Sequence, residues 1–181
     1  IHPSPFQTTC ILQADAIFWN PIAICKWMTG MDDRIKHHTF VFERRCKAGI
    51  ERVFAAFSDP VERARWSTPS ETAALLYDPN DFREGGQDVF RCGSREAPQF
   101  KGVTTYISIM PSSRIVSSEV VESGGQILMA NLITTLLSEE GSETRVRMTV
   151  QVTSFCGDEM LQGTEAGNNA SLDNLVQHLA Q

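Results

Sequence analysis

The sequence predicts an α+β domain in which a curved antiparallel sheet holds a long C-terminal helix on its concave side, around an apolar cavity. Three observations predict it: helical signals over residues 50–66, strand-like segments separated by turns over residues 72–155, and a helical pattern over residues 158–180. Short connections between consecutive strands favour antiparallel pairing, and an apolar sheet face has to be covered by another element.

A first strand and a first helix are expected at the start of this region. Residues 39–44 are rich in β-branched and aromatic side chains, with Phe40 and Phe42 on one face, which is typical of a strand. Residues 50–57 carry apolar side chains at positions i, i+3, i+4 and i+7, which form one face of a helix.

A second helix has a distinct start signal. Asp59 is a favourable N-cap residue, Pro60 suits the first helical position, and Glu62 stands three residues after the cap. This is a capping-box arrangement, in which side chains bond the free N–H groups at the helix start. The helix should run from Pro60 to about Trp66.

Further strands and one long helix are expected to complete the domain. The last strand alternates most clearly, with residues such as Val150 on a buried face and Arg147 on an exposed face. The helix over residues 158–180 is weakened by Gly163 and Gly167, at about 1 kcal/mol each relative to alanine. Breaks rich in Pro, Gly and Ser separate the strand candidates, which are residues 72–77, 87–92, 100–110, 114–122, 126–138 and 144–155.

Residues 1–30 differ from the rest of the chain. They carry few charges. Their apolar stretch at residues 16–19 is broken by Asn20 and Pro21 and lacks a preceding basic region, so it is a poor signal peptide, and it is too short for a membrane span. One interpretation is that Met31 is the biological start and the upstream part is not native. The other is a native extension whose aromatic side chains dock on the domain. The expected organisation is a poorly ordered or non-native segment 1–30 and a domain over residues 31–181.

Composition and charge exclude several classes of function. A formal net charge of −6 argues against binding nucleic acid, which requires a basic face. The five cysteines are scattered, without a CxxC pair or zinc-ligand spacing, which favours reduced thiols in a cytoplasmic protein and no metal site. Motifs of the forms GxSxG, GxxxxGK[ST] and HExxH are absent from the sequence, so no classical hydrolase, nucleotide-binding or zinc-protease mechanism and no cofactor are expected.

Several short motifs follow one another in a specific order. They are Phe54, Asp59-Pro60, Arg65-Trp66 and Pro69, followed by residues 82–86, 100–102, 111–116 and 141–146. This order resembles the START/Bet v 1-like superfamily (SRPBCC), within it the bacterial branch related to the activator of the heat-shock-protein-90 ATPase. The resemblance spans Thr39 to Ala180. It implies a helix-grip fold: a seven-stranded antiparallel sheet, two short helices after strand one, and a C-terminal helix over a ligand-sized cavity.

The sequence also departs from that family. Ser67 stands where a second tryptophan is frequent, and Asn168 follows Gly167 where the family often has a tryptophan. Both positions could shape the cavity, so no ligand preference is carried over. In the family, the activator of the heat-shock-protein-90 ATPase is a co-chaperone with a separate N-terminal domain that contacts the chaperone. Residues 1–38 of this chain are too short to form such a domain. The resemblance therefore does not extend to chaperone activation.

Eight residues are candidates for lining the cavity. Asp88 shares a strand face with Phe90 and would place a carboxylate at the cavity mouth, as a ligand anchor or an acid or base. The alternative for Asp88 is a solvated carboxylate at a strand end. The hydroxyl of Tyr106 could position a ligand. The full set of candidates is Trp66, Asp88, Phe90, Cys92, Tyr106, Met129, Met148 and Leu172.

Three functions are compatible with these patterns. The favoured one is binding of a small lipophilic molecule in the cavity. The second is an enzyme of the polyketide-cyclase kind, in which Asp88 and Tyr106 act on a bound substrate. The third is a co-chaperone-like domain that binds a protein partner, or a second copy, through its surface.

Overall fold

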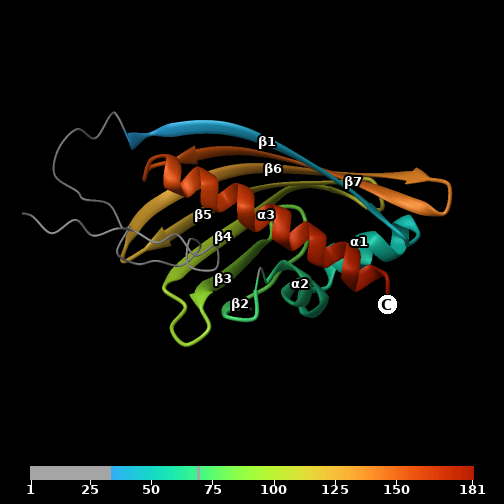
Figure 1. Cartoon of the computed structure of the whole chain (residues 1–181), viewed down its shortest axis with the longest axis horizontal. Coiled ribbons are helices and arrows are strands. Elements are labelled where there is room, and N and C mark those ends of the chain that lie inside the picture. Colours follow the sequence, from blue (N-terminus) through green and yellow to red (C-terminus); the bar gives the residue numbers. More distant parts are fainter. Residues whose placement is uncertain (1–33, 69) are drawn as a thin grey trace, which may run out of the picture.

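Seven strands form one antiparallel sheet in the computed structural model, which describes residues 34–68 and 70–181 (Figure 1). The strand order is β1-β7-β6-β5-β4-β3-β2, so the first two strands of the sequence lie at opposite edges. The strands are β1 (Lys36–Cys46), β2 (Ala73–Tyr77), β3 (Gln87–Ser94), β4 (Phe100–Met110), β5 (Arg114–Ser123), β6 (Gln126–Glu140) and β7 (Glu143–Ser154). The predicted helix-grip architecture is confirmed.

Three helices accompany the sheet. The short helices α1 (Ile50–Ser58) and α2 (Pro60–Ser67) connect the two edge strands. The long helix α3 (Asp158–Leu179) runs across the concave face of the curved sheet (Figure 1). It packs chiefly against β1 and α2, and less against β7.

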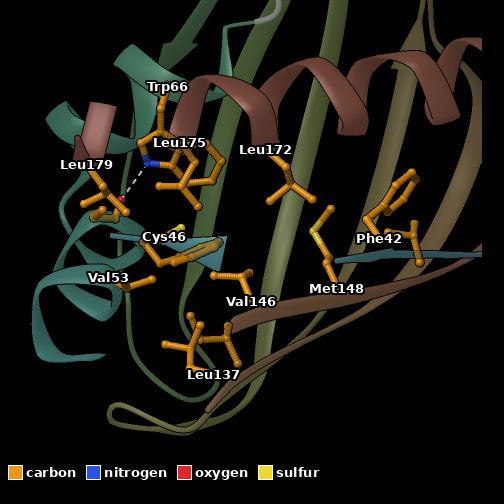
Figure 2. Close-up of a cluster of buried hydrophobic side chains, with 14 of the residues drawn as sticks. Phe42, Cys46, Val53, Trp66, Leu137, Val146, Met148, Leu172, Leu175 and Leu179 are labelled. Atoms are coloured by element: carbon orange, nitrogen blue, oxygen red, sulfur yellow. Dashed lines mark hydrogen bonds between the residues drawn. The ribbon is translucent and has the colours of Figure 1, made fainter. Parts of the chain in front are cut away.

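The hydrophobic core lies between α3 and the β1–β7 half of the concave face. Phe40 and Phe42 on β1 pair with Val150 and Met148 on β7, and all four side chains are buried. Leu172 and its neighbours on α3 point toward these strands (Figure 2). Each fully buried side chain of this size contributes about 1.5–3 kcal/mol of transfer free energy. The alternation predicted for the last strand therefore places its apolar side chains on the face of the sheet that packs against the helix.

The predicted N-cap of α2 is confirmed, although only half of the capping box forms. The carboxylate of Asp59 accepts hydrogen bonds from the backbone N–H groups of Val61, at 2.8 Å, and Glu62, at 2.9 Å. The reciprocal bond from the Glu62 side chain to the cap is replaced, because that carboxylate instead pairs with Arg52 at 2.7 Å. The backbone N–H of Asp59 donates to the last turn of α1.

Replacement of Asp59 by alanine is expected to lower the free energy of unfolding by about 1 kcal/mol, because two N–H groups of α2 lose their acceptor. Ser58→Ala is the matched control. The Ser58 hydroxyl donates back to the carbonyl of Ala55 in α1, so its loss should cost only a few tenths of a kcal/mol. Urea denaturation of both variants measures the difference. A larger loss for Ser58→Ala would contradict the assignment of the cap.

The predictions for residues 1–30 concern a segment outside the described residues. Whether the aromatic side chains of this segment (Phe18, Trp19 and Trp27) dock on the domain, and whether Met31 is the start, therefore remain predictions. Within residues 34–68 and 70–181, none of the helices has the length and apolar character needed to cross a membrane.

Candidate functional site

The strand register aligns four polar residues in one row across the concave face. Asp88 on β3 lies opposite Thr104 on β4, which lies opposite Glu119 on β5. Glu119 in turn lies opposite Asn131 on β6. The adjacent row on the same face consists of Phe90, Gly102, Val121 and Met129. The polar row thus lies beside a largely apolar row on the surface that faces α3.

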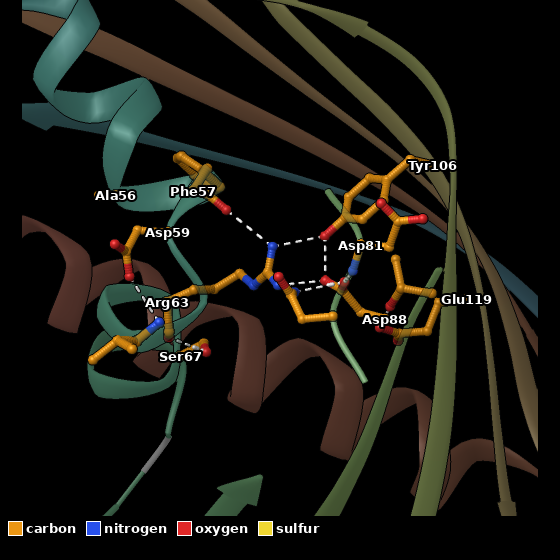
Figure 3. Close-up of polar contacts among 12 residues, drawn as sticks. Ala56, Phe57, Asp59, Arg63, Ser67, Asp81, Asp88, Tyr106 and Glu119 are labelled. Carbon is orange, nitrogen blue, oxygen red and sulfur yellow. Dashed lines mark hydrogen bonds and ion pairs between the residues drawn. The ribbon is translucent and has the colours of Figure 1, made fainter. Parts of the chain in front are cut away.

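Asp88 is one end of this row and is almost completely buried, with 1% of its surface exposed. One carboxylate oxygen accepts from the guanidinium of Arg63 and from the hydroxyl of Tyr106 (Figure 3). The other accepts from the Asn80 side chain at 2.6 Å and the backbone N–H of Asp81 at 2.9 Å. The solvated alternative for Asp88 is therefore wrong. Four donors fill its acceptor capacity, so these contacts do not favour the predicted role as a ligand anchor.

Arg63 brings α2 to the sheet through this carboxylate. Its guanidinium also donates to the carbonyl of Phe57 at 3.0 Å and to Tyr106 Oη at 2.6 Å, and it lies 4.6 Å from the centre of the Tyr77 ring. Sequence reasoning missed Arg63, because an arginine in a short charged helix usually faces water. The ion pair links α1, α2, β3 and β4 in one buried network.

Tyr106 is a hydrogen-bond donor in this network and not a base. Burial raises the pKa of Tyr106, the positive charge of Arg63 opposes that shift, and the hydrogen bond to Asp88 adds to it. The phenol therefore stays protonated at neutral pH and donates to Asp88. Its side chain is buried, with 5% of its surface exposed, so the predicted contact with a ligand would need a rearrangement.

Glu119 occupies the middle of the row and was missed by sequence reasoning. One carboxylate oxygen accepts from Thr104 Oγ1 at 3.2 Å and the other from Asn131 Nδ2 at 3.1 Å. Burial raises the pKa of Glu119, and the bonds from Asn131 and Thr104 only partly oppose that shift. The residue is nevertheless half-buried and not sealed. Its every-second spacing from Ile115 and Val121 fits an inward position, but Val116 and Val120 make the opposite face of β5 equally apolar, so the sequence held no clear signal for it.

Phe90, Cys92 and Met129 lie on the same face beside the row. The Phe90 ring covers Gly102 on the next strand so closely that a β-carbon there would overlap it, so only glycine at this position leaves room for the ring. Cys92 and Met129 are half-buried. Burial, with a smaller contribution from Glu119, raises the pKa of the Cys92 thiol to about 12, so it is not a thiolate nucleophile at neutral pH.

The other three predicted residues, Trp66, Met148 and Leu172, belong to the hydrophobic core (Figure 2). The indole N–H of Trp66 donates to the carbonyl of Ala56 at 2.9 Å, which ties the end of α2 to α1. The structure therefore divides the eight candidates. Five lie on β3, β4 and β6 near the polar row, whereas three pack the interior closer to β1 and β7.

Two depressions are found on the described surface, one of which reaches the polar row. One, of about 640 Å³, follows the strands β1, β7 and β6 near His37 and includes Asn131 in its lining. The other, of about 480 Å³, lies between the end of α2 and the end of α3 and includes Trp66 and His178. Within residues 34–68 and 70–181, no three His, Cys, Asp or Glu side chains come together in a way that could hold a metal ion.

Comparison with known proteins identifies close structural relatives. The family model described as "Activator of Hsp90 ATPase homolog 1-like protein" matches residues 47–180. A crystal structure of a protein from Rhizobium loti is 32% identical, with 80% of this chain and 98% of that chain covered and a TM-score of 0.70. A protein structure from Rhizobium leguminosarum is 30% identical, with coverage of 81% and 96% and a TM-score of 0.67. No curated protein sequence matches the chain at a significant level.

Proposed function

The chain belongs to the family of proteins like the activator of Hsp90 ATPase homolog 1, and from this premise we propose that it binds a lipophilic small molecule on the β3–β6 half of its concave face. The observation that carries the proposal is that α3 covers the two halves of the sheet unequally. On the β7 side, Val146, Val150 and Val152 are sealed, with at most 2% of their surface exposed. On the other side, Phe90 and Val121 are also buried, but Cys92 and Met129, which face the same way, remain half-buried.

This difference in exposure follows from where the helix packs. Close contacts of α3 are with β1, β7 and α2, so the strands β3 to β5 have less of the helix against them. A surface that combines apolar side chains with a few polar groups, and that solvent reaches only partly, is typical of a small-molecule site. Met129 adds a flexible thioether that adapts to ligands of different shape.

Binding is favoured over catalysis by the state of the polar groups. Asp88 is engaged by four donors, Tyr106 is held protonated, and the thiol of Cys92 is protonated at neutral pH. Asp88 and Tyr106, the groups that a polyketide-cyclase-like enzyme would use, are therefore already hydrogen-bonded within the protein. A cytoplasmic location stays an expectation from the reduced cysteines.

Binding of Nile red, a neutral lipophilic dye, tests the proposal. Cys92→Trp and, as a second variant, Met129→Trp place an indole in the proposed site and should weaken dye binding about tenfold or more, with an unchanged circular dichroism spectrum. Leu132→Trp is the matched control, because Leu132 is 39% exposed and lies on the opposite face of β6. It should leave binding unchanged.

The reverse result would contradict the proposal. If Leu132→Trp weakens binding and neither concave-face variant does, the dye binds the outer face of the sheet. That face carries exposed apolar side chains, among them Leu132 and Leu136, and a protein partner or a second copy would then be the favoured ligand.

A further inference from the structure

Glu119 is an inward-facing acid whose charge has no compensating cation among the described residues. Its hydrogen-bond partners, Thr104 and Asn131, are neutral. The nearby positive charge of Arg63 is already matched by Asp88. An ionised carboxylate removed from water without a counter-ion is costly, and the raised pKa of Glu119 expresses that cost. A proton or a bound cation would relieve it.

Asn131 supplies a second, independent observation. The residue is buried, with 7% of its surface exposed, and its amide nitrogen donates to Glu119. The amide oxygen Oδ1 is also buried, yet it has no hydrogen-bond partner in the part of the chain that the structure describes. Buried acceptors are usually bonded, so a buried acceptor without a protein partner is a candidate contact for a ligand.

The two features require the same kind of ligand. Glu119 and Asn131 are neighbours in the polar row, joined by the hydrogen bond from the Asn131 amide nitrogen, and the carboxylate and the amide oxygen are both hydrogen-bond acceptors. An ammonium group has three donors and a positive charge, so one such group can bond both oxygens and neutralise the acid. A hydroxyl can bond one oxygen but leaves the charge of Glu119 uncompensated.

We propose that Glu119 and Asn131 form the polar anchor of the binding face and that its ligand is an amine with an apolar body. This inference rests on the proposed function. The apolar body would lie along the adjacent row of Phe90 and Met129, and the amine would donate to Asn131 Oδ1. The Arg63–Asp88 pair would bound the anchor at the β3 end of the polar row.

Displacement of Nile red by three chain-matched probes, decylamine, decanol and decanoate, tests the anchor. Decylamine should displace the dye from the unmodified protein at about tenfold lower concentration than decanol, and decanoate should be the weakest of the three. Glu119→Gln keeps the shape of the side chain and removes its charge. In this variant the advantage of decylamine should disappear while the affinity for decanol stays the same. Asn131→Leu should also weaken decylamine, several-fold.

Glu122→Gln is the matched control for the loss of one negative charge. Glu122 is on the same strand and pairs at the surface with Lys101, so the preference for decylamine should persist in this variant. If decanol displaces the dye as well as decylamine does, or if Glu122→Gln removes the preference as fully as Glu119→Gln, ligand binding stands and the amine anchor is wrong. If the dye does not bind the concave face at all, the proposed function fails and the anchor fails with it.

Discussion

Replacing Asp88 by alanine is expected to lower the free energy of unfolding by about 3–5 kcal/mol, because Arg63 would remain buried without its counter-charge. Arg63 and Asp88 expose only 7% and 1% of their surface. Tyr106 would also lose the acceptor for its hydroxyl. A domain of this kind is stable by about 5–15 kcal/mol in total, so the variant should approach the threshold of unfolding. Urea denaturation followed by circular dichroism measures the loss.

Asp81→Ala is the matched control for this experiment. Asp81 lies next to the network, but its side chain is 44% exposed and pairs with Arg83 at the surface, so its loss should cost no more than about 1 kcal/mol. Adding Arg63→Leu to Asp88→Ala should recover part of the stability, because it removes the unpaired charge. Equal losses for Asp88→Ala and Asp81→Ala would mean that the ion pair does not hold α2 on the sheet.

Val150→Asp should be the most damaging single change on β7, with a loss of at least about 4 kcal/mol. Val150 is completely buried between Phe40 on β1 and Ile133 on β6. A carboxylate at this position would have no partner and would have to be desolvated or protonated. The expected result is a protein that unfolds at ambient temperature or at low urea concentration.

Arg147→Asp introduces the same residue on the opposite face of the same strand. The Arg147 side chain is 52% exposed and makes a surface pair with Glu43 at 3.5 Å. Loss of this pair should change stability by no more than about 1 kcal/mol. Comparable losses for Val150→Asp and Arg147→Asp would show that the register of β7 is wrong.

Local patterns in the sequence were sufficient to predict the helices and strands. The alternation of β7, the apolar spacing in α1 and the Asp59-Pro60 start of α2 are each confirmed close to the expected bounds. Such signals depend on residues a few positions apart, which share one face of a helix or strand whatever the rest of the chain does. For the same reason, the inward direction of Asp88, Phe90 and Tyr106 could be predicted from their strands.

The partners of those side chains depended on contacts between distant parts of the chain. The strand β5 carries apolar residues on both faces, so its periodicity does not indicate that Glu119 points inward. Arg63 was not predicted to pair with Asp88, because an ion pair between residues 25 positions apart leaves no periodic signal. The amino-acid sequence by itself therefore determined the elements, their order and the inward residues of the clearest strands. Only the tertiary structure decided the register that places Asp88, Thr104, Glu119 and Asn131 in one row, because register between strands is set by side-chain packing across the whole sheet.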